Sequence, residues 1–113
     1  MAVVLVAEDE PAVRTLVCMV LQMAGYSVIP AANGLEAIAL YRTSPDRFDL
    51  VLTDLDMPVM DGYQLVSLIR ESTPEARIVC MSGNPRDLPP DVSFLQKPFT
   101  PQALKDAVHQ VAV

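Results

Sequence analysis

The sequence is poor in basic residues and in cysteine, and each shortage removes a class of function. Eight Lys and Arg residues stand against fourteen Asp and Glu residues, giving a net charge of −6. That sign is wrong for direct contact with a nucleic-acid backbone, so we expect no nucleic-acid partner. The two cysteines, Cys18 and Cys80, lie in apolar stretches without CxxC spacing, which favours buried thiols over a redox or metal role.

A long hydrophobic run is also lacking at the start of the chain. The apolar opening has no basic residue and meets acidic residues at Glu8, so it is too short for a signal peptide or a membrane span. We expect a first strand there, a cytoplasmic protein and no membrane partner. The 113 residues are 51% hydrophobic with no low-complexity tract, which predicts one compact domain over residues 1–113.

Short apolar runs alternate with segments of helical periodicity along the chain. This alternation predicts a parallel α/β sheet with helices on both faces and right-handed crossovers, which is a doubly wound fold. Strands are expected at residues 3–7, 28–29, 50–54, 78–81 and 94–95. Helices are expected at about residues 13–24, 62–70 and 101–111, and Ala37, Ile38 and Tyr41 mark a further helix that ends before Pro45.

The connection between the fourth and fifth strands is unusually short. The other crossovers have 19, 18 and 22 residues (8–26, 32–49 and 55–76), whereas residues 83–92 number ten and include Pro85, Pro89 and Pro90. A crossover that contains a helix needs about 10–12 residues, and proline interrupts helical hydrogen bonding. We therefore predict at most one helical turn here, so the fourth helix is short or missing.

Charged and polar residues follow the expected strands at one edge of the sheet. Because the carboxyl ends of parallel strands share an edge, the following residues should converge there: Glu8, Asp9, Glu10, Asp54, Asp56, Ser82 and Lys97. Like charges about 4 Å apart repel by about 4 kcal/mol at an effective dielectric constant near 20, so this cluster favours a cation. Oxygen ligands without nearby His or Cys indicate a hard ion, and Mg²⁺ suits a few carboxylates better than Ca²⁺ does.

These residue types match the requirements of phosphoryl transfer to a carboxylate. A carboxylate can attack phosphorus to give an acyl phosphate, while catalysis consists mainly of positioning and charge neutralisation. Asp54 ends the central strand and is the best candidate nucleophile. Lys97 offers a fixed positive charge and Ser82 a hydroxyl donor.

Five motifs in order resemble the receiver domain of two-component response regulators. They are Glu8-Asp9 after the first strand, Asp54-x-x-Met57-Pro58, Met60-Asp61-Gly62, Ser82-Gly83 and Lys97-Pro98-Phe99. The resemblance covers nearly the whole chain and implies a flavodoxin-like fold with strand order 2-1-3-4-5. It fits both a stand-alone regulator and a receiver within a longer chain, such as a hybrid kinase.

The resemblance assigns roles at the sheet edge. Asp54 would accept a phosphoryl group from a histidine kinase or phosphotransfer protein, and Mg²⁺ would be bound by Asp9, Asp54 and the backbone carbonyl of Asp56. Glu8, where Asp is more frequent, would act through water. Ser82 and Lys97 would hold the phosphoryl oxygens, and the Lys97–Pro98 bond would be cis. Such a domain is not an enzyme but a phosphoacceptor that assists its own phosphorylation and dephosphorylation.

The resemblance also implies a switch that signals to a downstream protein, whose identity the sequence does not give. In similar proteins the hydroxyl of strand four moves toward the phosphoryl group while an aromatic residue on strand five turns inward, and Ser82 and Phe94 occupy these positions. Because the fourth helix commonly belongs to the output surface, we hypothesise that output here uses the first or last helix or the strip beside residues 83–92.

Several less specific interpretations compete with these. Asp61 is more simply a helix cap, Glu10 a solvent-facing acid near a helix N-terminus, and His109 a surface histidine and not a phosphohistidine donor. The side chain of Asp56 is either an exposed bystander or a modulator of hydrolysis. An aspartyl phosphatase could also use Asp54-Leu55-Asp56 but needs a cap domain, and a flavin-binding module needs a phosphate-binding loop. An EF-hand is excluded because Val59 occupies its glycine position. The strongest alternative is a phosphate-independent scaffold.

Overall fold

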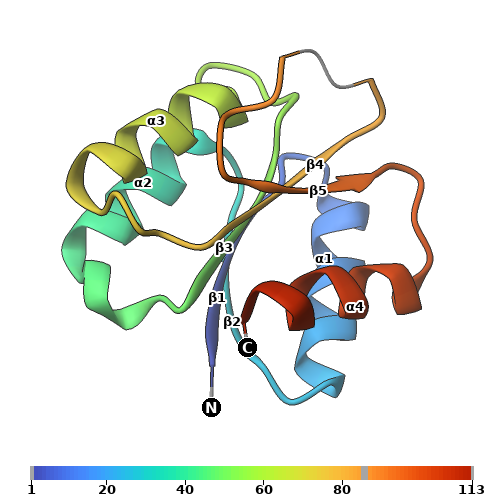
Figure 1. Cartoon of the computed structure of the whole chain (residues 1–113). Helices are drawn as coiled ribbons and strands as arrows, with labels where there is room; N and C mark the ends of the chain where they lie inside the picture. Colours follow the sequence, from blue (N-terminus) through green and yellow to red (C-terminus); the bar gives the residue numbers. More distant parts are fainter. Residues whose placement is uncertain (1, 85–86, 113) are drawn as a thin grey trace.

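The computed structural model describes residues 2–84 and 87–112 as three layers, with one central sheet between two pairs of helices (Figure 1). The elements follow in the order β1 (Val3–Ala7), α1 (Pro11–Met23), β2 (Ser27–Ala31), α2 (Gly34–Thr43), a short 3₁₀ turn η1 (Pro45–Arg47), β3 (Leu50–Asp54), α3 (Gly62–Ser72), β4 (Ile78–Ser82), β5 (Ser93–Gln96) and α4 (Pro101–Ala112). The five strands are parallel and lie in the order β2-β1-β3-β4-β5. The doubly wound, flavodoxin-like fold and its strand order are confirmed.

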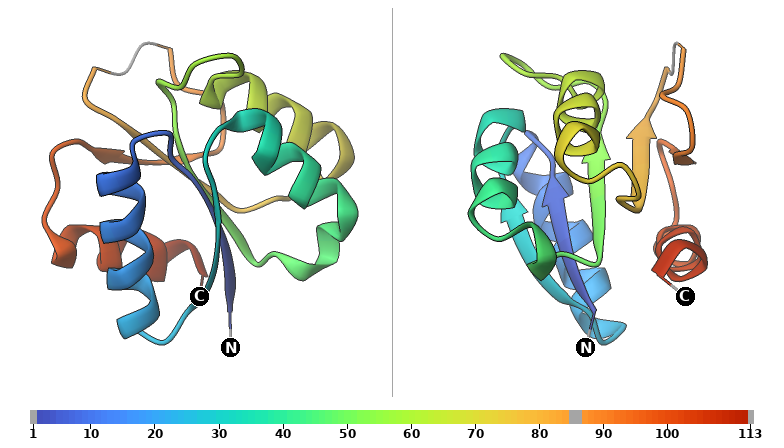
Figure 2. Two further views of the ribbon diagram at one scale, coloured as in Figure 1. Left: turned by 180° about the vertical axis from the view of Figure 1, so that it is seen from behind. Right: turned by 60° about the vertical axis from the view of Figure 1, so that its left-hand side comes forward.

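The period of two along each strand divides the core into two clusters. On one face, Leu5, Val51 and Cys80 pack with residues of α2 and α3. On the other face, Val6, Leu52 and Met81 pack with residues of α1 and α4. Figure 2 shows the two helix pairs on opposite sides of the sheet. Every residue of β3 is buried, as expected of a central strand covered on both faces.

Local signals in the sequence explain where the helices begin and end. Asn33 caps α2, and Asp61 forms a capping box with Gln64 at the start of α3. The hydroxyl of Thr100 accepts a hydrogen bond from the Ala103 amide at the start of α4. Helix α1 is followed by Gly25, whose φ of 100° is costly for other residues. Strand β2 and helix α3 are longer than the sequence predicts, because pairing and packing extend them.

The connection between β4 and β5 contains no helix in its described residues, 83–84 and 87–92. Pro85, one of the prolines behind that expectation, lies outside the described part of the chain. In the structure, Arg70 of α3 reaches across to this connection and donates hydrogen bonds to the carbonyl oxygens of Pro90 and Asp91. The Nη2 atom of Arg70, which donates to Asp91, also lies 3.4 Å from the Ala76 carbonyl oxygen. One side chain of α3 therefore holds the end of this connection, at Pro90 and Asp91.

None of the helices in the described ranges has the length and apolar character needed to cross a lipid bilayer.

Candidate acidic site at the sheet edge

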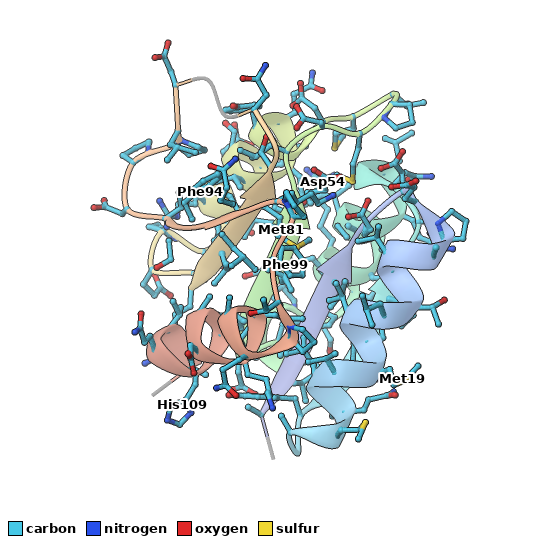
Figure 3. All side chains as sticks on the ribbon, turned by 90° about the vertical axis from the view of Figure 1, so that its right-hand side faces the viewer. Met19, Asp54, Met81, Phe94, Phe99 and His109 are labelled. Carbon is cyan, nitrogen blue, oxygen red and sulfur yellow. The ribbon has the colours of Figure 1, made fainter. Side chains whose placement is uncertain are left out.

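The structure places Asp54 at the carboxyl end of β3, at the edge where the other candidate residues also lie. Figure 3 shows Asp54 near the upper end of the strands and His109 at the opposite end of the molecule. Glu8 and Asp9 follow β1, Ser82 ends β4 and Lys97 follows β5. The parallel topology thus brings together side chains that are up to 89 positions apart in the chain.

Lys97 bridges two of the acidic side chains. Its Nζ atom lies 2.7 Å from Oε1 of Glu8 and 2.9 Å from Oδ2 of Asp54. Burial by itself would lower the pKa of Lys97, but hydrogen bonds and charge attraction from both carboxylates outweigh it and raise that pKa. Lys97 is therefore a fixed positive charge directly beside Asp54, as the sequence suggests.

Glu8 is the most deeply buried of the three carboxylates, with no exposed surface. Burial raises its pKa from 4.5 to about 7; the hydrogen bond from Lys97 opposes that rise, and the charge of Asp54 adds to it. Its Oε2 atom also accepts a hydrogen bond from the Glu10 amide at 3.2 Å. The metal-free protein therefore holds a carboxylate whose ionisation is incomplete near neutral pH.

Asp9 completes a set of three carboxylates. One oxygen from each of Glu8, Asp9 and Asp54 lies within 4.8 Å of the other two. Arg14 stabilises the loop that carries Glu8 and Asp9, because its side chain donates a hydrogen bond to the carbonyl oxygen of Glu8 at 2.8 Å. Three hard oxygen donors this close together, with Asp9 partly open to solvent, fit Mg²⁺ and leave positions for other ligands.

The backbone fixes the orientation of Asp54. Its Oδ1 atom accepts a hydrogen bond from the Asp56 amide at 3.0 Å, while Oδ2 faces Lys97. The loop after β3 folds tightly back, since the Gly62 amide donates to the Leu55 carbonyl at 3.1 Å. A Cβ atom on Gly62 would lie 2.3 Å from the carbonyl oxygen of Asp54. Glycine is therefore required for this loop to close beside the carboxylate.

The side chain of Asp56 makes a contact that the sequence does not reveal. Its Oδ2 atom accepts a hydrogen bond from the Ser82 hydroxyl at 2.7 Å. Asp56 is exposed, yet its side chain has this hydrogen-bond partner, and its role as a modulator of hydrolysis stays a prediction. The Asp-x-Asp spacing was the available signal, although only the fold shows that the second carboxylate faces β4.

The remaining expectations concern the switch and the simpler interpretations. Phe94 is half-buried and packs against the cluster on the α2 and α3 side of the sheet, and the Lys97–Pro98 bond is cis. Asp61 is a helix cap, and both Glu10 and His109 are exposed. Cys80 is buried, but Cys18 is only half-buried, because its position on α1 lies at the margin of the packed face.

The fold and this acidic site define a class of signalling domain. The family model described as "Response regulator receiver domain" matches residues 4–109, and the chain belongs to that family. It is thus a receiver domain of two-component signalling, a kind of domain that interacts with histidine kinases or phosphotransfer proteins. This assignment sets aside the aspartyl phosphatase and flavin-binding alternatives.

Two relatives from Brucella abortus illustrate the contexts in which similar chains occur. The response regulator receiver protein CpdR is 36% identical over 115 residues, which is 96% of this chain and 92% of that protein. The sensor kinase CckA is 37% identical over 117 residues, and the match covers 97% of this chain but only 12% of that protein. Among solved structures, the response regulator TrrA of Thermotoga maritima, in complex with Mg²⁺-BeF, has a TM-score of 0.88 at 31% identity. That match covers 98% of this chain and 99% of TrrA.

Proposed function

We propose that the domain, residues 1–113, is a phosphorylation-activated switch in which Asp54 is the phosphoacceptor. A carboxylate oxygen of Asp54 attacks the phosphorus of a phosphohistidine on a kinase or phosphotransfer protein. A bond from phosphorus to this oxygen forms, the bond to the imidazole nitrogen breaks with its electron pair, and an acyl phosphate results. The domain then changes its interaction with a downstream protein.

The observation that carries this proposal is the ion pair between Asp54 and Lys97, which lies beside the acidic side chains of Glu8 and Asp9. An incoming phosphoryl group is itself anionic, so a site made only of carboxylates would repel it. Lys97, at 2.9 Å from Asp54, supplies a positive charge where the phosphoryl oxygens would lie. The fixed geometry of Asp54 matters equally, because phosphoryl transfer depends largely on positioning and charge neutralisation.

A divalent cation completes this charge balance in the proposal. Asp9, Asp54 and the backbone carbonyl of Asp56 would hold Mg²⁺ directly, with Glu8 acting through water. When bound, the ion would offset the negative charge of the acids and of the phosphoryl group. The support is the donor set itself, three carboxylate oxygens within 4.8 Å of one another. TrrA, a similar protein, was solved with Mg²⁺-BeF.

The face of α1 beside the site is the surface on which we place the phosphodonor. Leu16 and Met19 are 47% and 50% exposed, one helical turn apart, and Figure 3 shows Met19 pointing outward from α1. A groove of about 380 Å³ lies between this helix and Lys97, and Val13 and Phe99 contribute to its lining. Apolar side chains exposed beside a reactive site are typical of a docking surface.

Acetyl phosphate with Mg²⁺, followed by intact mass measurement, tests the central claim. We expect a single added phosphoryl group on the wild-type chain and none on Asp54→Asn. EDTA should prevent the reaction, because the acids would then be unneutralised. A phosphoryl group that persists on Asp54→Asn would show that another residue is the acceptor.

A protein donor separates docking from chemistry. Leu16→Arg should slow transfer from a phosphorylated phosphotransfer protein by tenfold or more, roughly the loss of one buried anchor, and leave acetyl phosphate labelling unchanged. Leu35→Arg is the matched control, since Leu35 is 49% exposed but lies on α2. Equal slowing by both variants would remove α1 as the docking face. If neither donor phosphorylates the wild-type chain, the phosphate-independent scaffold becomes the better description.

A further inference from the structure

The Ser82 hydroxyl donates its hydrogen bond to a residue other than Asp54, the proposed phosphorylation site. Ser82 has no exposed surface, and its Oγ atom donates to Oδ2 of Asp56 at 2.7 Å. The same oxygen accepts a hydrogen bond from the Asn84 amide at 3.1 Å. Since the Asp56 amide donates to Asp54, one hydrogen-bonded chain links Asp54, Asp56, Ser82 and Asn84.

The donor capacity of a hydroxyl makes this arrangement exclusive. A serine hydroxyl carries one proton and can therefore donate one full hydrogen bond at a time. While Ser82 donates to the carboxylate of Asp56, its proton is not available to an oxygen on a phosphorylated Asp54. An ionised acceptor at 2.7 Å is also a strong one, because charge-assisted hydrogen bonds are shorter and stronger than neutral ones.

We propose that the Asp56 side chain is a positioning residue that holds Ser82 in the unphosphorylated arrangement. The proposal rests on the function proposed above and on the role that the resemblance assigns to Ser82, a contact with the phosphoryl oxygens. Two anions, the Asp56 carboxylate and the phosphoryl group, compete for one proton. Activation requires the phosphoryl group to accept this proton in place of Asp56. The strength of the Ser82–Asp56 hydrogen bond therefore sets how strongly phosphorylation shifts the equilibrium.

The contact also gives the switch a route into the connection after β4. Asn84 is the second residue of that connection, and its amide is held by the oxygen that moves when Ser82 changes partner. On the next strand, Gln96 donates from its side chain to the Gly83 carbonyl at 3.1 Å. Release of Ser82 from Asp56 would therefore loosen the amide of Asn84 at the start of this connection.

Beryllofluoride binding in excess Mg²⁺ tests the inference, because beryllofluoride stands in for the phosphoryl group without turnover. We expect Asp56→Ala to bind it about tenfold more tightly than the wild type, since a hydrogen bond to a charged acceptor no longer competes. Asp56→Asn keeps an acceptor oxygen without the charge and should show a smaller gain. Asp56 is exposed, so neither substitution removes a core contact, and thermal melting verifies the fold.

A double-mutant cycle separates the hydrogen bond from simple charge removal. In a Ser82→Ala background, Asp56→Ala should leave beryllofluoride affinity unchanged, because no hydroxyl is left to release. The same tightening in both backgrounds, or equal gains from Asp56→Ala and Asp56→Asn, would overturn the proposal. Faster exchange of the Asn84 amide in Asp56→Ala is the expected structural signature. Wild-type protein that binds no beryllofluoride would instead count against the proposed function itself.

Discussion

Replacing Asp54 by Asn should stabilise the metal-free protein, even though it breaks an ion pair. Asp54 lies close to two like charges and one opposite charge. Glu8 and Asp9 present oxygens within 4.8 Å of it, and Lys97 lies at 2.9 Å. The sign of the effect depends on whether two repulsions outweigh one attraction, and the distances allow an estimate.

At an effective dielectric constant of about 20, each repulsion is worth about 3.5 kcal/mol at this separation, and the attraction of Lys97 about 6 kcal/mol. The balance is a net destabilisation of about 1 kcal/mol from the Asp54 charge. Asn retains an oxygen that can accept from Lys97, so part of the attraction survives the substitution. For a domain of this size, 1 kcal/mol corresponds to roughly 4 °C in melting temperature.

Thermal melts at pH 8 in EDTA provide the assay, since Glu8, with a pKa of about 7, is then largely ionised. Asp54→Asn should melt about 4 °C higher than the wild type. Added Mg²⁺ should reverse the order, because a ligand that binds only the folded state stabilises it and the wild type keeps all three carboxylates. A lower or unchanged melting temperature for Asp54→Asn in EDTA would refute the acidic-cluster reasoning.

Three further perturbations test separate parts of the structure. The pKa of Glu8 in the folded protein is about 7, against an ordinary 4.5. Between these two pH values the folded protein therefore binds more protons than the unfolded chain does. The free energy of unfolding should fall by up to about 3 kcal/mol as pH rises through that window. Denaturant titrations at pH 5 and pH 8 in EDTA measure this, and Glu8→Gln should flatten the difference. Val59 has a φ of 68° and is 81% exposed. Val59→Gly should therefore stabilise the protein by about 0.5–1 kcal/mol, and Val59→Ala should stabilise it less. A less stable Val59→Gly variant would contradict backbone strain at this position. Arg70→Ala should destabilise by about 2 kcal/mol and speed amide exchange in β5, whereas Arg42→Ala, an exposed arginine on α2, should do neither.

The fold was predictable because each of its signals is local. Hydrophobic period, the Asn33 and Asp61 caps, and Pro11 at the start of α1 all lie within a few residues of the structure they produce. The count of ten residues after β4 was enough to predict at most one helical turn there, and the described residues of that connection contain no helix. Element ends were less predictable, because β2 and α3 are extended by pairing and packing that depend on distant parts of the chain.

Much of the candidate site was also predictable, since parallel strands must bring their carboxyl ends to one edge. The particular atoms that pair at that edge were not predictable. The sequence suggested Lys97 as a counter-charge for the acids but not its simultaneous contact with Glu8 and Asp54. The bond from Ser82 to Asp56 depends on the pairing of β3 with β4 and on the loop that Gly62 closes.

The described residues of the β4–β5 connection, 83–84 and 87–92, contain no helix, and hydrogen bonds hold both ends of the connection. The start of the connection is bonded to Ser82 through the Asn84 amide. Its end is bonded to α3 through Arg70, which donates to the Asp91 carbonyl at 2.6 Å. The described ends of the connection are therefore each bonded to a neighbouring element, Asn84 to β4 and Asp91 to α3. Phe94, the second residue of β5, packs against the same cluster as α3. The two residues of the expected switch therefore lie at the two ends of this connection, Ser82 directly before it and Phe94 two residues after Val92.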